Sequence, residues 1–282
     1  MMRRYLSLIA ISVIIQSLTS CSERLDEDIT ASDHQLIRYL SYIEEYLLPN
    51  NYWPEGRLTR LFNVPEYDEE GRIRVAYVDF TGIPANHVYT YSDDQIILRK
   101  NCMEDEDYSH VYTLKDGRII SCHKSSYDDL KPGDEYYEFS YDEQGYLSEI
   151  RTYQNEDLEL FISVAWKDGN MISTTKHLIL YDGSVYPIIT EYSYKRDKKY
   201  KGAFMAFYLQ FGFFGVYGVD EILAGQGYFG HMISKDIVVT EDQGGPARND
   251  YKVEIDKNGN ISKVFQLSTT GKAIREYRLI WR

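Results

Sequence analysis

One short turn recurs along the chain and restricts what the chain can fold into. In each copy an apolar or aromatic residue precedes a short loop, and an apolar residue follows it. The loop contains both an aspartate and a glycine. The copies span residues 67–73, 114–119, 141–147, 166–171 and 255–261, and residues 91–96 form a glycine-free relative. Asp-Gly between two apolar runs is a strong hairpin signal, because both central residues need positive φ. We therefore expect a series of antiparallel β-hairpins.

The turns come in two lengths that predict equivalent pairing. Two copies have a two-residue Asp-Gly loop, and the other three carry an extra residue, which a three-residue loop with a left-handed glycine and a bulge can absorb. The apolar cross-strand pairs that follow are Leu114 with Ile119, Trp166 with Met171, Tyr141 with Leu147, and Ile255 with Ile261. Successive turns are mostly about 22 to 28 residues apart, which leaves room for two strands and a return. The fold class is therefore mainly β, an antiparallel meander of hairpins that forms a curved sheet or an open barrel.

A helical spacing precedes this pattern. Ser32 and Gln35 form a capping-box arrangement, and the apolar residues that follow at helical spacing are Leu36, Ile37, Leu40, Ile43 and Leu47. Pro49 ends the pattern. We expect one N-terminal α-helix, residues 33–48, at the start of a single β-rich domain, residues 32–282.

The segment 203–219 is a long apolar run rich in phenylalanine and glycine. It does not suit a membrane span, because Gln210 interrupts it and its glycines each weaken a helix by about 1 kcal/mol. We expect the curved sheet to wrap this segment as an internal plug. The alternative is an exposed apolar patch that binds a lipid or a partner.

The first twenty residues have the anatomy of a signal peptide. Arg3 and Arg4 precede an apolar run of eleven residues, 5–15, which is too short to span a membrane. The segment 18–21, Leu-Thr-Ser-Cys, resembles the bacterial lipobox, which implies cleavage before Cys21 and a lipid on its thiol. The alternative is a plain secretory peptide. Residues 21–31 are then a polar tether.

The residues after Cys21 bear on location. Ser22 stands where an aspartate would retain a lipoprotein at the inner membrane, which favours a lipid-anchored protein of the outer membrane. The acidic run 22–28 loosely resembles the signal that exports some Bacteroidetes lipoproteins to the cell surface. Both the periplasmic and the surface-exposed face stay open.

Several motifs together resemble one family. They are the lipobox, the aromatic-Asp-x-x-Gly hairpins, the segment 191–197 with the Lys-Gly-Ala-Phe of 201–204, and the closing stretch 251–281. From about Tyr67 onward the chain is similar to an uncharacterised family of Bacteroidetes outer-membrane lipoproteins, a domain of unknown function. The hairpin motif also resembles the tyrosine-aspartate repeats of large secreted proteins. The chain departs from the family pattern at 198–200, Lys-Lys-Tyr, where an Asn-Pro pair is common. The resemblance implies no catalytic residues.

Charge and composition narrow the partners. The formal net charge of −13 repels phosphate backbones, so we expect no nucleic-acid partner. Anionic lipid headgroups are disfavoured for the same reason, and membrane attachment then depends on the lipid at Cys21. The 27 tyrosines suit cross-strand packing, and the alternative is a tyrosine-lined groove for a glycan or a peptide.

Two pairs of residues are candidates for chemistry. Counting outward from the pair Leu114 and Ile119 places His110 opposite His123, and two imidazoles on adjacent strands can chelate a metal ion, although a satisfied or solvated pair is the simpler interpretation. Cys102 and Cys122 could form a disulfide in an oxidising compartment. A meander instead separates their strands by two spacings, about 9.5 Å, so we expect free, mostly buried thiols.

No sequence motif identifies an enzyme or a cofactor. The chain has no nucleophile elbow, His-Glu-x-x-His pair, phosphate loop or dinucleotide fingerprint, so we expect no cofactor. The leading hypothesis is a non-enzymatic binding module at the outer membrane for a glycan, a peptide or a protein. The alternatives are a carrier of a hydrophobic ligand held against residues 203–219, and a secreted hydrolase, whose acids or histidines would have to converge in a cleft.

Overall fold

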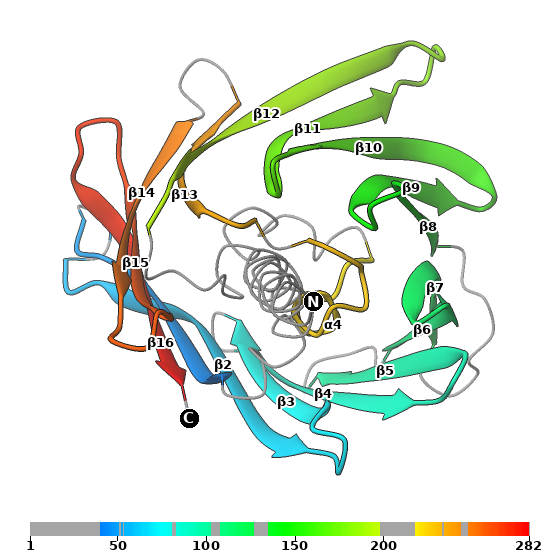
Figure 1. The fold of residues 1–282 in the computed structure, drawn as a ribbon, viewed down its shortest axis with the longest axis horizontal. Helices are drawn as coiled ribbons and strands as arrows, with labels where there is room; N and C mark the ends of the chain where they lie inside the picture. Colours follow the sequence, from blue (N-terminus) through cyan, green and yellow to red (C-terminus); the bar gives the residue numbers. More distant parts are fainter. Residues whose placement is uncertain are drawn as a thin grey trace, which may run out of the picture.

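Sixteen antiparallel strands form one closed barrel in a computed structural model of the chain (Figure 1). The structure describes residues 40–50, 52, 54–80, 83–102, 108–126, 135–197, 218–232, 234–243 and 248–281. Each strand pairs with the next in sequence, and β1 pairs with β16 to complete the ring. The expected meander of hairpins is thus confirmed, and the sheet is closed rather than open.

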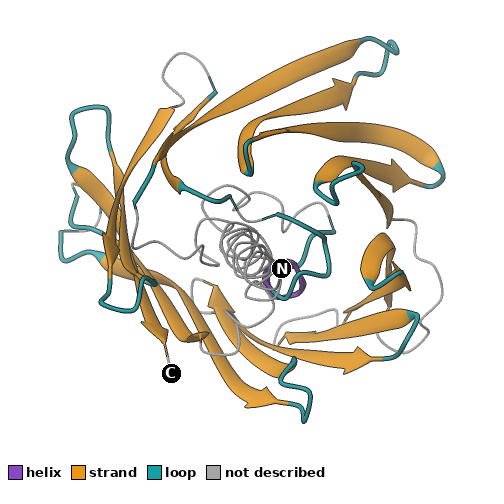
Figure 2. Ribbon diagram, viewed as in Figure 1, coloured by secondary structure: helices purple, strands orange, loops and turns teal. Residues whose placement is uncertain are grey.

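The strands are short and of similar length. Their bounds are β1 Leu40–Leu47, β2 Arg57–Tyr67, β3 Ile73–Phe80, β4 Ile83–Tyr91, β5 Gln95–Cys102, β6 Tyr108–Lys115, β7 Arg118–Ser126, β8 Glu135–Tyr141, β9 Leu147–Gln154, β10 Asp157–Lys167, β11 Asn170–Ile179, β12 Val185–Lys195, β13 Ile237–Asp242, β14 Arg248–Ile255, β15 Ile261–Leu267 and β16 Ala273–Trp281. Among the described residues one helix, α4 (Glu221–Gly225), lies inside the ring of strands (Figure 2). In the part of the chain that is described, no helix is long and apolar enough to cross a membrane.

All six predicted turns connect neighbouring strands, and the four predicted apolar pairs are confirmed. The aspartate stabilises the longer turns directly. In the turn 141–147, Oδ1 of Asp142 accepts hydrogen bonds from the backbone N–H groups of Gln144 (3.0 Å) and Tyr146 (2.9 Å), and Gly145 adopts φ 86°. The aspartate therefore satisfies the backbone donors of the loop, and glycine supplies the left-handed conformation.

These six turns all lie at one end of the barrel, because each joins an even-numbered strand to the following odd-numbered one. We call it the turn end. Strand β1 begins there and β16 finishes there, since Leu40 pairs with Trp281. We call the opposite end, which holds the connections 48–56, 155–156, 180–184 and 268–272, the far end.

An aromatic side chain links four of the bulged turns to the next strands along the chain. Tyr141 Oη donates to the carbonyl of Ile119 at 2.6 Å, and Trp166 Nε1 donates to the carbonyl of Leu147 at 2.8 Å. Tyr91 bonds Ile73, and Tyr194 bonds Met171, in the same way. Each acceptor belongs to the pair next to a bulge, where the strand ladder is interrupted. The aromatic position of the repeat thus supplies a donor for a carbonyl that the bulge takes out of the ladder.

The hairpin 91–96 is the informative exception. It has no bulge, and the following hairpin carries Leu114, which has no donor, at the aromatic position. Bulge and aromatic donor are therefore absent together among these described hairpins. Tyrosine enrichment in this chain has a structural cause at several positions, as the cross-strand interpretation predicts.

The expected helix over 33–48 is wrong for residues 40–47, which form β1; residues 33–39 lie outside the described part. Ile43 is buried and faces inward together with Glu45, while Glu44 faces outward. Glu45 binds Arg275 at 2.9 Å, so a charged residue occupies an inward position and conceals the alternation of a strand. The two backbone ladders to β2 and β16 override the local helical signal.

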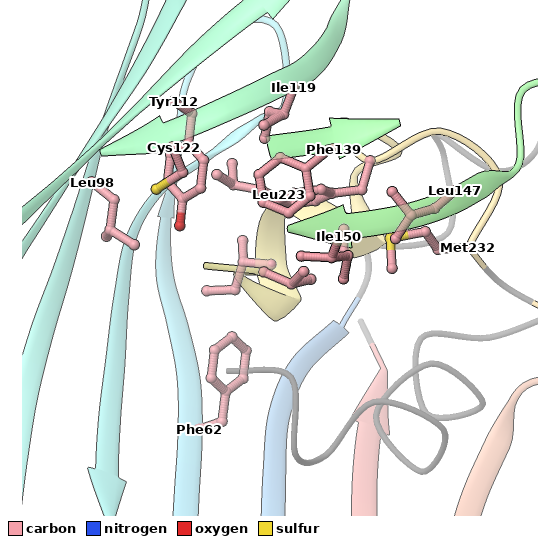
Figure 3. Packing of buried hydrophobic residues seen from close by; sticks show 14 of the residues in the cluster. Phe62, Leu98, Tyr112, Ile119, Cys122, Phe139, Leu147, Ile150, Leu223 and Met232 are labelled. Carbon is pink, nitrogen blue, oxygen red and sulfur yellow. The ribbon is translucent and has the colours of Figure 1, made fainter. Parts of the chain in front are cut away.

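The apolar core lies inside the barrel at the turn end. Inward residues from most strands pack with α4 and the residues after it; Leu223, Phe229 and Met232 are at most 1% exposed. Figure 3 shows Leu223 among side chains that include Phe139 and Ile150. The predicted plug over 203–219 lies mostly outside the described residues, and of it only Gly218 and Val219 are described, with Val219 in this core.

The segment 218–236 is fastened to the turns by its backbone. The N–H of Ile119 donates to the carbonyl of Tyr228, the N–H of His231 donates to that of Gly145, and the N–H of Lys235 donates to that of Gly169, all at 2.8–2.9 Å. These bonds reach three successive hairpins. The segment therefore covers the turn end from the inside.

Candidate functional site on the inner wall

The inner wall of the barrel changes from apolar at the turn end to polar at the far end. Side chains alternate across a strand, so a residue two positions before or after a core residue also faces inward. His110 therefore faces inward like Tyr112, Lys100 like Leu98, and Lys124 like Cys122. Other described inward polar residues toward the far end include Glu45, Arg57, His87, Glu135, Lys176, Glu241, Asn249, Gln266 and Arg275.

One part of this wall, on β4 to β8, is basic. Lys100 pairs with His87 across β4 and β5, and Lys124 pairs with His110 across β6 and β7. Lys124 Nζ also lies 3.2 Å from an oxygen of Glu135, and the Lys124 side chain is 42% exposed although it faces inward. Water therefore reaches this level of the inner wall.

His110 lies in the middle of this basic part. Its ring stacks on Tyr112, with centroids 6.0 Å apart, and the residue is 8% exposed. Burial lowers the pKa of His110 well below its ordinary value, and the positive charges of Lys100 and Lys124 lower it further. The imidazole is consequently neutral at physiological pH.

The opposite part of the wall, on β13 to β16 and β1, holds a chain of polar side chains around two carboxyl groups. Tyr251 Oη donates to Glu241 at 3.0 Å, Gln266 Nε2 donates to Asn249 at 2.6 Å, and Arg275 binds Glu45. Burial raises the pKa of Glu241, although hydrogen bonds from Tyr251, Asn249 and Gln243 act in the other direction. These contacts hold the carboxyl groups against the wall.

The predicted pairing of His110 with His123 is wrong. A bulge between Thr113 and Leu114 shifts the register, so His110 pairs with Lys124 and Val111 pairs with His123. His123 faces outward and packs on Tyr136 with ring centroids 4.4 Å apart. The two histidines thus lie on opposite faces of the wall, and the geometry that motivated a metal site is not present. Within the described ranges, no group of three or more His, Cys, Asp or Glu side chains is arranged to hold a metal ion.

The cysteine prediction is confirmed where it can be followed. Strands β5 and β7, which carry Cys102 and Cys122, flank β6 as the meander requires. Cys122 is a buried free thiol, and burial raises its pKa well above the ordinary value. The side chain of Cys102 lies outside the described part.

The outer wall carries ion pairs in the middle of its strands. Examples are Arg151 with Glu149 at 2.7 Å on β9, and Arg278 with Glu276 at 2.8 Å on β16. Arg248 of β14 lies 3.1 Å from Asp250. The register places all of these side chains outward. The barrel is therefore charged outside and apolar inside at the turn end.

Exposed apolar residues gather at one hairpin of the far end. The connection between β11 and β12 and the start of β12 carry Leu180, Tyr181, Val185, Tyr186 and Ile189, all at least 46% exposed. Val185 and Tyr186 point to opposite faces of β12, so the hairpin tip is accessible on both sides.

The closed, sixteen-stranded antiparallel barrel is a porin-like fold, where the hairpins alone predicted a curved sheet or an open barrel. The chain belongs to the family described as domain of unknown function (DUF4595) with porin-like fold, whose model matches residues 52–269. This agrees with the predicted resemblance to an uncharacterised family.

Two solved structures are similar in fold. A porin-like protein from Bacteroides uniformis ATCC 8492 has a TM-score of 0.57 at 14% identity, covering 86% of this chain and 98% of that one. A porin-like protein from Bacteroides vulgatus ATCC 8482 has a TM-score of 0.49 at 11% identity with the same coverage. No curated protein matches the chain. The first similarity supports the fold.

The basic inner wall was not predicted from the sequence. Lys100, His110 and Lys124 are separated by up to 24 residues, and each looks like an ordinary polar position of an amphipathic strand. The available signal was the face: Lys100 follows Ile96 and Leu98 at period two, which places a lysine on the apolar side of its strand. Cys21, the predicted lipid-bearing residue, lies outside the described residues.

Proposed function

We propose that this chain is a lipid-anchored outer-membrane protein whose barrel stands in water and binds a soluble ligand at its far end. The observation that carries the proposal is the polarity of the wall. A barrel that spans a membrane has an apolar outer band and a polar lumen. In this barrel the outer wall carries ion pairs at mid-strand, and the lumen is apolar at the turn end.

The outer charges oppose burial in lipid. An arginine on the lipid face costs about 2–4 kcal/mol at the bilayer midplane. Arg151 and Arg278 lie within their strands, and Arg248 begins β14. All three side chains point outward, each beside a carboxylate that would also lose its hydration. Attachment then depends on the acyl chains at Cys21, since the negative chain has no electrostatic attraction for anionic lipids.

The lumen supports binding rather than conduction. At the turn end the core and the segment 218–236 occupy the interior, and hydrogen bonds hold that segment to three hairpins. At the far end polar inward side chains are accessible, as the exposure of Lys124 shows, and Arg275 is 44% exposed. A ligand can thus reach polar groups fixed on rigid strands, an arrangement common to barrel binding sites. The ligand is a glycan, a peptide or a segment of a protein.

Fractionation tests the attachment. Residues 1–21 are replaced with a leader that is cleaved without lipidation, and the protein is compared with the original chain in a bacterium that processes lipoproteins. We expect the lipid-free chain in the aqueous periplasmic fraction without detergent, and the original chain in the outer membrane. A lipid-free chain that stays in the membrane after alkaline carbonate extraction would show that the barrel itself is inserted.

Ligand capture tests the binding role. The lipidated protein, purified in mild detergent, is applied to a glycan array and used for pull-down from outer-membrane extracts. Retention of a defined glycan or protein is the expected result. Absence of retention in both assays contradicts a binding module of this kind.

A further inference from the structure

We propose that the inner wall of β4 to β8 holds a binding site for a small oxyanion, a carboxylate or a phosphate group, formed by Lys100 and Lys124 on either side of His110. The inference rests on the proposed function, since it names the chemical class that the far end binds.

The strand order brings the two lysines to one place. Lys100 is on β5, His110 on β6 and Lys124 on β7, and all three face inward. Backbones two strands apart are separated by about 9.5 Å, a gap that two long lysine side chains can close from both sides. The geometry thus suits one oxyanion that two ammonium groups contact together above β6.

The electrostatics of His110 support this convergence. After burial, the two charges that lower its pKa are those of Lys100 and Lys124. Both ammonium groups therefore act on the same imidazole, although 24 residues separate them in the sequence. An anion between them would meet a concentrated positive field inside a low-dielectric wall, where charge-assisted hydrogen bonds are strong.

The net charge of this part of the wall is opposite in sign to that of the whole chain. The formal net charge of the protein is −13, yet the described inward face of β4 to β8 carries two lysines against one acid, Glu135. The nearest acid of the covering segment, Asp220, accepts hydrogen bonds from Tyr89 and from the start of α4. The basic wall is therefore a local feature of the inner face.

Accessibility allows a ligand to enter. The Lys124 side chain is 42% exposed and that of Glu135 is 29% exposed, at a level above the buried core. Lysine acts as a point charge with three donors, so it accommodates both carboxylate and phosphate without the fixed planar geometry that arginine requires. We therefore expect the two lysines to distinguish ligands by negative charge more than by shape.

Titration calorimetry on the full chain in mild detergent tests the inference. The probes are inorganic phosphate, D-galacturonate and the neutral sugar D-galactose, at low and at raised NaCl. We expect binding of at least one of the two anions, none of galactose, and weakening by salt, because salt screens the charges. Which of the two binds more tightly separates a phosphate ligand from a carboxylate ligand.

Substitutions locate the site. Lys100→Gln and Lys124→Gln should each weaken anion binding about tenfold, which corresponds to the loss of one charge-assisted contact of about 1.4 kcal/mol. The matched control is Lys252→Gln, an outward, exposed lysine on β14, which should leave the affinity unchanged. Thermal melting of each variant confirms that the barrel is folded.

The outcomes separate the two proposals. Binding of neither anion, or anion binding that Lys100→Gln and Lys124→Gln leave unchanged in folded protein, overturns the oxyanion site. If the glycan array or the pull-down still gives a ligand in that case, the binding function stands and only its chemical class is wrong. If capture fails as well, both proposals fail.

Discussion

Replacing Tyr141 with phenylalanine tests the link between hairpins. The substitution removes one hydroxyl, whose 2.6 Å hydrogen bond to the carbonyl of Ile119 joins the β8–β9 hairpin to the β6–β7 hairpin. The ring stays, and with it the contact to the Arg118 guanidinium 5.6 Å away. Burial raises the pKa of Tyr141, so the hydroxyl keeps its proton and acts as a donor at neutral pH.

The expected loss follows from the environment of the acceptor. Ile119 is fully buried, so its carbonyl finds no water to replace the hydroxyl. An unsatisfied buried acceptor costs about 1–3 kcal/mol, and we expect Tyr141→Phe to lower the free energy of unfolding by about 2 kcal/mol. For a domain of this size that corresponds to a fall in Tm of about 4–8 °C.

The assay is urea unfolding followed by circular dichroism, with Tm from calorimetry. The control is Tyr153→Phe on β9, in which the lost hydrogen bond joins Glu138 on the outer wall, where water can replace it. We expect its effect to stay below about 0.5 kcal/mol. Equal effects of Tyr141→Phe and Tyr153→Phe would refute the idea that the bulged carbonyl depends on the aromatic donor.

Three further predictions concern His110, Gly230 and Asp220. Because the pKa of His110 is lowered well below 6.5, the unfolded chain takes up a proton there that the folded chain does not. The free energy of unfolding therefore falls as pH drops below 6.5, by up to about 1.4 kcal/mol per pH unit. Urea unfolding at pH 7.5 and 5.5 should show a smaller loss of stability at the lower pH for His110→Phe than for the original chain. A Cβ at Gly230, where φ is +67°, would lie 2.4 Å from the carbonyl oxygen of Gly145. The control is Gly183→Ala, where φ is +78° and a Cβ would meet no atom within 4 Å, and Gly230→Ala should destabilise the protein by about 1–3 kcal/mol more than this control. Equal Tm values of the two variants would contradict this. Asp220→Ala removes the N-cap of α4 and the acceptor for Tyr89, a loss of about 2–4 kcal/mol, and hydrogen exchange should accelerate over the described residues of 218–236. Unchanged exchange there would show that Asp220 does not help to hold this segment in place.

Local chemistry made the hairpins predictable. Asp-Gly loops and the apolar residues that flank them specify both the turn and the first pair of each hairpin, and the pair Trp166 and Met171 was obtained by counting alone. Counting failed where a bulge intervened. The extra residue after Ile119 shifts the pairing of His110 by one position, and an error of one position moves a side chain to the other face of the sheet.

Long-range pairing was not predictable in the same way. The first strand was mistaken for a helix because inward Glu45 interrupts its apolar face, and its partner Arg275 is 230 residues away. Closure of the barrel depends on that pairing, so the sequence suggested a curved sheet. The basic wall escaped notice for a different reason: Lys100 and Lys124 come together only when β5, β6 and β7 pair in the observed register, and a bulge sets part of that register.

The pairing of β1 with β16 also sets the order in which the molecule can assemble. Most neighbouring strands are joined by short connections, so hairpins can form early, with little loop-closure entropy to overcome. The last ladder joins the two ends of the described chain and cannot form before residues 273–281 arrive. Until then, two strands expose unpaired backbone groups that invite pairing with other chains. We expect the closing step to be slow, and the chain is most vulnerable to aggregation just before it.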